Sequence, residues 1–133
     1  MIANAAIAEN YGPASLMQLA HLQTHMMVNA YSVLLLFQAT RALLQAGGGG
    51  GAGGMPKFVY VGAPISTITD MENCARAPLA AYGVSKLAGN YLVRKLHFEN
   101  KWLVAFVVDP GCVFFFSFFF HLRAGLFLGF VQL

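Results

Sequence analysis

Two long stretches of helical periodicity organise the first part of the chain. Residues 16–46 contain neither glycine nor proline, and their apolar positions recur every three or four residues, which predicts one long helix. Asn29 and Ser32 bound a short run of weaker helix formers, so we expect a break or kink there. Residues 79–100 repeat the amphipathic spacing and predict a second helix.

Short apolar runs lie outside these helices and predict strands. They cover residues 1–8, residues 57–61, which are rich in aromatic and β-branched side chains, and residues 102–108, which precede an Asp-Pro-Gly turn. A polar loop is expected at residues 62–78. Continuous apolar strands that alternate with helices are typical of an α/β fold whose parallel sheet is covered on both faces.

The composition changes abruptly after residue 111. Six of the eight residues between 113 and 120 are phenylalanine. We therefore expect a domain at residues 1–111 and an apolar Phe-rich tail at residues 112–133. A membrane helix needs about 20 apolar residues, and Arg123 near its middle would cost about 2.5–3.5 kcal/mol. A poorly packed terminal segment, or sequence foreign to the domain, is therefore favoured over a membrane anchor through residues 113–133.

Composition and charge exclude some classes of function. The chain has 133 residues, enough for one domain, with eight Lys and Arg against five Asp and Glu and a formal charge of +3. The basic residues are scattered and form no stripe, so no nucleic-acid partner is expected. With 58% hydrophobic and 10% charged residues, the chain is not of the intrinsically disordered class.

The cysteines and the first residues predict a cytoplasmic protein. Cys74 and Cys112 are too few and too far apart for a disulfide framework or a zinc site, so we expect reduced thiols. Residues 1–8 lack the basic leader of a signal peptide. His21 and His25 lie four residues apart on a predicted helix, but no third ligand lies near them, so no metal site is predicted.

The glycine run at residues 47–54 resembles a phosphate-binding loop only superficially. Seven of its eight residues are glycine, but no Lys-Ser/Thr pair follows. The run also comes after a predicted helix, whereas a phosphate loop connects a strand to a helix. We interpret it as a flexible surface loop.

The stretch Ala81-Tyr82-Gly83-Val84-Ser85-Lys86 carries the clearest chemistry. Tyr82 and Lys86 are four residues apart on a predicted helix, so their side chains share one face. An ammonium group near a phenol favours the phenolate and lowers its pKa from about 10. Tyr82 is then suited to exchange a proton with a carbonyl or alcohol oxygen. A solvated pair on a helix surface is the alternative for this spacing taken alone.

Further motifs along residues 1–111 bear on that choice. With the acid/base stretch, they are Ile2–Ala6, Val28–Asn29, Pro56–Val61, Tyr82–Lys86, Arg94–Asn100 and Asp109–Gly111. In order and spacing these motifs resemble the short-chain dehydrogenase/reductase family, and most nearly its fungal norsolorinic acid ketoreductase-like branch, akin to sniffer-type carbonyl reductases. The resemblance implies a partial Rossmann-type three-layer fold with a parallel sheet, lacking the first strands and the Gly-rich cofactor turn.

The resemblance also implies an NAD(P)-dependent oxidoreductase, with NADP or NAD as cofactor and a small-molecule carbonyl or alcohol as substrate. Tyr82 would be the general acid/base, and Lys86 would bind the nicotinamide ribose and depress the Tyr82 pKa. Asn29 would be the helix-breaking asparagine whose backbone orders a relay water. Asn4 would line the adenosine side of the cofactor, and Pro110–Gly111 would lie beside the nicotinamide. Family members are often homo-oligomers.

The chain departs from the family's pattern in three places. The Gly-rich turn that places the cofactor's diphosphate at a helix N-terminus is missing. Gly62 and Ala63 stand where the family has a Ser-Ser pair that includes the catalytic serine, so Ser66 or Thr67 would have to supply the hydroxyl. After Gly111 the family's Thr-containing loop is replaced by the Phe-rich tail.

Two functions therefore stay open. One is a carbonyl or ketone reductase, or a fragment of one, with a Tyr-Lys acid/base mechanism. The alternative is a non-catalytic truncated remnant of the family that associates at most with a partner, or with a membrane through its tail. In both cases the strand near Ile2 has an unpaired apolar edge, so we expect poor solubility.

Overall fold

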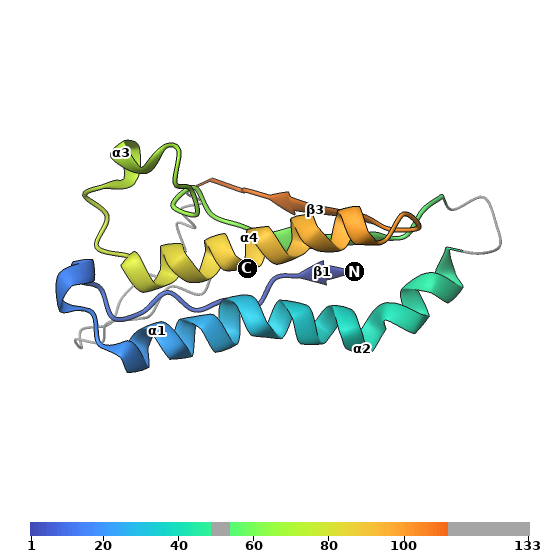
Figure 1. Cartoon of the computed structure of the whole chain (residues 1–133), viewed down its shortest axis with the longest axis horizontal. Helices are drawn as coiled ribbons and strands as arrows, with labels where there is room; N and C mark the ends of the chain where they lie inside the picture. Colours follow the sequence, from blue (N-terminus) through green and yellow to red (C-terminus); the bar gives the residue numbers. More distant parts are fainter. Residues whose placement is uncertain (49–53, 112–133) are drawn as a thin grey trace, which may run out of the picture.

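A three-stranded parallel sheet lies against a layer of helices in the computed structural model, which describes residues 1–48 and 54–111 (Figure 1). The α/β class and the parallel sheet predicted from the sequence are confirmed. The strands, in spatial order, are β1 (Ile2–Ala3), β2 (Lys57–Val61) and β3 (Val104–Val108). The helices are α1 (Leu19–Met26), α2 (Ser32–Gly47), α3 (Met71–Cys74) and α4 (Ala80–Glu99), preceded by a 3-10 turn at Ala14–Leu16.

The predicted irregularity in the long helix is confirmed. Helices α1 and α2 follow one another through Met27–Tyr31, which adopt π-helical geometry around Asn29. Such single π-turns widen a helix locally and are frequent at functional sites. The helix begins at Leu19 rather than at residue 16, because the preceding residues form the separate 3-10 turn.

The central strand β2 fixes the register of the sheet. Ile2 pairs with Val59, and Val59 pairs with Phe106 on the other side. Because all three strands run in the same direction, their carboxyl ends meet at one edge. That edge lies at the end of the molecule where α1 and α4 begin (Figure 1).

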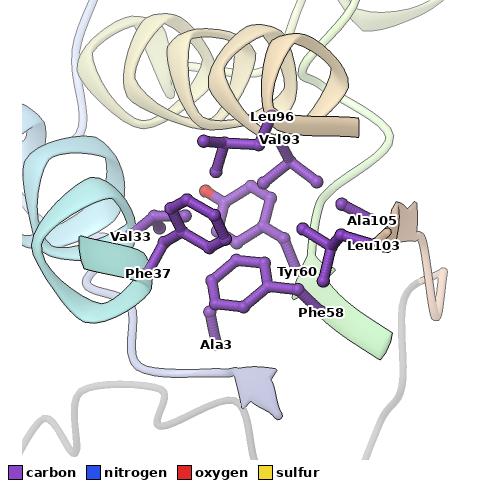
Figure 2. Packing of buried hydrophobic residues seen from close by; sticks show 9 residues of the cluster. All are labelled: Ala3, Val33, Phe37, Phe58, Tyr60, Val93, Leu96, Leu103 and Ala105. Carbon is purple, nitrogen blue, oxygen red and sulfur yellow. The ribbon is translucent and has the colours of Figure 1, made fainter. Parts of the chain in front are cut away.

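Side chains on alternate positions of the strands build the hydrophobic core. Figure 2 shows Phe58 and Tyr60 pointing from β2 into the space between α2 and α4. The edge of one ring meets the face of the other where Phe37 of α2 contacts Phe58, with centroids 5.6 Å apart. We call this side of the sheet the helix-covered face; its strand residues are Ala3, Phe58, Tyr60 and Ala105.

The opposite side of the sheet is exposed. Ile2 is 64% exposed, Phe106 41% and Val108 37%. The sequence predicted a sheet covered on both faces, and for the described residues this is wrong, because α2 and α4, which contact the sheet, both pack on one side. We call this side the open face; its residues are Ile2, Val59, Phe106 and Val108.

Several predicted boundaries change in the structure. β1 is far shorter than residues 1–8, and the loop at residues 62–78 contains α3. The predictions for the tail, and for most of the glycine run, lie outside the described residues. Within the described ranges, Leu19–Gly47 has the length and hydropathy of a membrane span, a property that core helices of soluble proteins share.

Candidate functional site

Helix α4 places the predicted acid/base pair against the sheet. Tyr82 is 5% exposed and Lys86 is 1% exposed, so both side chains lie on the buried face of the helix. The alternative of a solvated surface pair is therefore wrong. The first turn of α4 stands at the edge where the strands end, which brings Tyr82 close to Asp109 after β3.

Lys86 is held by the strand beneath it. Its Nζ donates a hydrogen bond to the Val61 carbonyl oxygen at 2.8 Å and lies 4.8 Å from the centroid of the Tyr60 ring. The centroid of the Tyr82 ring is 5.7 Å from the same nitrogen. Burial lowers the pKa of Lys86 from 10.5 to about 8, so the amine still carries its proton at neutral pH.

Tyr82 is protonated at neutral pH. Burial raises its pKa above 10, and the negative charge of Asp109 raises it further. The sequence predicted a lowered pKa for Tyr82, and the net direction is wrong: desolvation and the charge of Asp109 outweigh any stabilisation of the phenolate by the nearby Lys86 ammonium group. A neutral phenol is the form that donates a proton to a carbonyl oxygen.

Asn29 ties the π-turn to two other parts of the chain. Its Oδ1 accepts a hydrogen bond from the Ile7 backbone N–H at 2.8 Å, and its Nδ2 donates to the Ile7 carbonyl at 2.9 Å. The same Nδ2 donates to the Ser85 hydroxyl of α4 at 2.9 Å. The Asn29 carbonyl accepts a hydrogen bond from the Tyr60 hydroxyl at 2.9 Å. Tyr60 therefore engages the backbone of the residue to which the resemblance assigned the ordering of a relay water.

Ser66 is buried and already has two hydrogen-bond partners. Its hydroxyl donates to the Ala63 carbonyl and accepts from the Asn90 amide nitrogen at 2.8 Å. Thr67 is used differently, since its hydroxyl accepts the Asp70 N–H at the start of α3. A Cβ on Gly62 would lie 2.7 Å from a Val107 methyl, so a serine does not fit there without movement.

The predicted cofactor-contacting residues follow the ends of the strands. Asn4 comes directly after β1, and the register places it level with Val61, whose carbonyl binds Lys86. Pro110 and Gly111 follow β3; Gly111 has a φ of +69° and donates its N–H to Asp109. In open parallel α/β sheets, ligands bind outside the carboxyl ends of the strands. Asn4, Lys86 and the turn after β3 thus lie at one sheet edge.

The described ends of the glycine run lie away from this carboxyl edge. Gly47 is the last residue of α2, and Gly54 precedes the amino end of β2.

Sequence reasoning missed three residues that support this site. Tyr60 was identified only as part of a strand and Ser85 only as part of the Ala81–Lys86 stretch, and Asn90 was not singled out. Their spacing was the available signal, since positions 82, 85, 86 and 90 share one helix face. Asn90 Oδ1 is buried and has no hydrogen-bond partner among the described residues.

The histidine pair stabilises a loop. His25 is fully buried; its Nδ1 lies 2.7 Å from the His21 carbonyl, which makes that nitrogen the donor. Its Nε2 then accepts the Glu9 backbone N–H at 3.1 Å. Both ring nitrogens of His25 are thus used within the fold, and residues 1–48 and 54–111 contain no cluster of three metal-ligating side chains.

A mainly apolar cavity of about 470 Å³ opens beside the first turn of α4. Residues of α3, the turn after Gly12 and the segment before α4 line it, and Arg76 contributes a charge. Tyr82 is not among its lining residues, although its neighbour Gly83 is. The cavity therefore lies next to the acid/base pair without containing it.

Comparison with known proteins finds relatives that are named as ketoreductases or short-chain dehydrogenases. No protein-family model matches the chain. The norsolorinic acid ketoreductase stcE of Emericella nidulans is 68% identical over 111 residues, covering 84% of this chain and 40% of that protein. The chain thus spans about two fifths of the length of this curated relative.

Solved structures share the fold. A protein named as the carbonyl reductase Sniffer of Caenorhabditis elegans matches with a TM-score of 0.74 and 27% identity, over 83% of this chain and 50% of that one. A gluconate 5-dehydrogenase of Burkholderia cenocepacia, solved with NADP and tartrate, matches with a TM-score of 0.67 and 21% identity, over 83% and 39%. The second likeness shows the fold alone.

Proposed function

Because the chain belongs to the short-chain dehydrogenase/reductase family, we propose that it carries the acid/base pair of a nicotinamide-dependent ketoreductase. The observation that carries the proposal is the burial of Tyr82 and Lys86 on one face of α4, beside the edge where the strands end. The proposed reaction is reduction of a ketone to a secondary alcohol, or its reverse.

Tyr82 would be the proton donor. When bound, the nicotinamide cofactor would supply a hydride to the carbonyl carbon. The Tyr82 phenol would donate its proton to the carbonyl oxygen as negative charge develops there. Its raised pKa supports this direction, because the group stays protonated at neutral pH. The positive charge of Lys86 would then stabilise the phenolate that remains.

Lys86 and the strand ends would hold the nicotinamide half of the cofactor. One of the three Nζ protons of Lys86 binds the Val61 carbonyl, and an ammonium group can donate to ribose hydroxyls as well. Asn4, Pro110 and Gly111 lie at the same edge of the sheet. The described residues contain no Gly-rich strand-to-helix turn. The diphosphate would therefore be bound by a segment that corresponds to the unmatched part of the relatives.

An aromatic polyketide ketone is the proposed substrate class, with NADPH as the reductant. The support for the substrate class is the 68% identity to a norsolorinic acid ketoreductase. The partner would be a small molecule. The cytoplasmic location expected from the sequence stays a prediction.

A non-catalytic remnant is the second candidate. Ala63 provides no hydroxyl where the family's serine is expected, and the Ser66 hydroxyl is already engaged by Ala63 and Asn90. These observations favour loss of one catalytic contact, whereas the buried Tyr82 and Lys86 favour retention of the acid/base pair.

Replacement of Tyr82 tests the proposal. NADPH oxidation in the presence of an aromatic ketone would be compared for the unmodified chain, Tyr82→Phe and Tyr91→Phe. General acid catalysis contributes about 10²–10⁴-fold, so we expect a loss of that size in Tyr82→Phe. Tyr91 is 70% exposed on the same helix, and its replacement should leave the rate unchanged. Turnover retained in Tyr82→Phe contradicts the role of Tyr82; no turnover in the unmodified chain supports the remnant.

A further inference from the structure

We propose that Tyr60 is a positioning residue for Lys86. The face of its ring holds the ammonium group beside Tyr82, while its hydroxyl fastens strand β2 to the π-turn at Asn29. The catalytic meaning of this role rests on the proposed function, but the contacts and their test do not.

The position of Tyr60 connects three parts of the fold. It lies on the central strand, is fully buried, and points toward the helices (Figure 2). Its hydroxyl donates to the Asn29 carbonyl at 2.9 Å, and its ring centroid lies 4.8 Å from Lys86 Nζ. One side chain therefore contacts the π-turn, the central strand and α4.

Gly89 makes room for this arrangement. A Cβ at position 89 would lie 2.5 Å from the Tyr60 hydroxyl oxygen and 2.6 Å from the ring carbon that bears it. Glycine in the interior of a helix is destabilising relative to alanine. Gly89 sits in the middle of the 20-residue helix α4, and the close approach of Tyr60 is the physical reason for it.

The Tyr60 ring partly replaces the hydration that the Lys86 ammonium group loses on burial. In the residues that the structure describes, the Val61 carbonyl is the one hydrogen-bond acceptor of Nζ, and no carboxylate forms an ion pair with it. A buried ammonium group with a single acceptor is costly. The negative face of an aromatic ring within about 6 Å stabilises such a cation.

The other groups near Lys86 do not replace the ring of Tyr60. The Tyr82 ring centroid is farther away, at 5.7 Å. Asp109 acts on Tyr82 rather than forming a pair with Lys86. If the Tyr60 ring lost its negative face, the charged form of Lys86 would become less stable. The ammonium group would then no longer be favoured at its position near Tyr82.

Titration of Lys86 in the full chain tests the proposal. The lysine side chains would be followed by NMR with isotope-labelled lysine, and the Lys86 signal assigned with Lys86→Arg. Tyr60→Phe keeps the ring and removes the hydroxyl, so the Lys86 pKa should stay within about 0.3 units of the unmodified value, well below the one-unit effect expected from the ring. Pentafluorophenylalanine at position 60 keeps the shape but reverses the charge distribution of the ring, so the pKa should fall by about one unit.

Graded fluorination separates positioning from simple packing. With one to five ring fluorines, the pKa of Lys86 should fall stepwise, whereas a residue that only fills space would leave it unchanged. Gly89→Ala supplies a second route, because the added methyl displaces the Tyr60 ring and should also shift the Lys86 signal. An unchanged pKa across the fluorinated series overturns the proposal.

The outcome is independent of catalysis. If Lys86 responds as expected and the chain shows no turnover, the role of Tyr60 stands and the proposed function fails. If turnover depends on Tyr82 but the Lys86 pKa does not respond to the ring at position 60, the proposed function stands and the role of Tyr60 fails.

Discussion

The two faces of the sheet are built from the same strands and similar residue types, but they differ in what covers them. On the helix-covered face Phe58 is fully buried between α2 and α4. On the open face Phe106, in the adjacent strand, is 41% exposed, in one row with Ile2 and Val59. An apolar strand is thus able to bury both faces, but neighbouring elements decide whether it does.

The chemistry follows the same division. Tyr82, Lys86 and Tyr60 all lie between α4 and the helix-covered face, where burial shifts their pKa values. A titratable group on the open face would show a smaller pKa shift, because exposed groups keep their hydration. A face that is closed by helices is therefore a precondition for the proposed acid/base pair.

A matched pair of phenylalanine substitutions should give the largest difference between the faces. Phe58→Ala removes a fully buried ring, which typically costs about 3–5 kcal/mol and would unfold much of a small domain. Phe106→Ala removes a ring that is already 41% exposed and leaves no enclosed cavity, so the loss should be clearly smaller. Urea unfolding followed by circular dichroism measures both. Equal losses would show that the open face is covered in solution.

Stability should depend on pH through Lys86. Its pKa falls from 10.5 in the unfolded chain to about 8 in the fold. Between these values the unfolded state binds more protons, so the free energy of unfolding rises with pH. At 1.36 kcal/mol per pH unit, the expected gain from pH 8 to pH 10 is about 2 kcal/mol. Above pH 10 the buried tyrosines, whose pKa values are raised, oppose this trend.

Two lysine substitutions test whether Lys86 causes this rise in the free energy of unfolding with pH. Lys86→Met should abolish the rise between pH 8 and pH 10, because the titrating group is gone. Lys95→Met is the matched control, since Lys95 lies on the same helix with an exposed side chain paired to Glu99. Denaturant unfolding at a series of pH values reports both. If the free energy of unfolding still rises with pH in Lys86→Met, another group causes the rise.

Much of the fold was predictable because it depends on local pattern. The alternation of aromatic and β-branched residues predicted β2 at its observed bounds, Lys57–Val61. The weak helix formers near Asn29 predicted the irregular turn, though not its π-helical geometry. Tyr82 and Lys86 were identified by a spacing that a helix places on one face.

The remaining features depend on contacts between distant residues. The link from Tyr60 to Asn29 spans 31 positions, and the space at Gly89 has meaning only when β2 lies against α4. The direction of the Tyr82 pKa shift depends on desolvation and on Asp109, neither of which is visible in the spacing of Tyr82 and Lys86. The open face was missed because apolar periodicity does not report which elements are present to cover it.

Charges on the open face should change solubility more than stability. Ile2→Lys and Phe106→Lys place ammonium groups on exposed positions of an edge strand and of the open face. Ile2 is 64% exposed, and such substitutions usually change stability by no more than about 0.5 kcal/mol; Phe106→Lys should cost about as much as Phe106→Ala. Lysine on an edge strand also disfavours pairing with another chain. The soluble fraction after centrifugation should therefore rise, while the urea midpoint falls no further than in Phe106→Ala.

A loop substitution distinguishes the open face from exposed apolar surface in general. Ile68 is 71% exposed, comparable with Ile2, but it lies in the loop before α3. If association proceeds through the sheet, Ile68→Lys should increase the soluble fraction much less than Ile2→Lys alone, which adds the same charge. Equal gains would mean that net charge, rather than an uncovered sheet, controls association. A larger gain on the sheet would show that the open face is the surface through which this chain self-associates, because an apolar row in strand register offers both side chains and an unpaired edge.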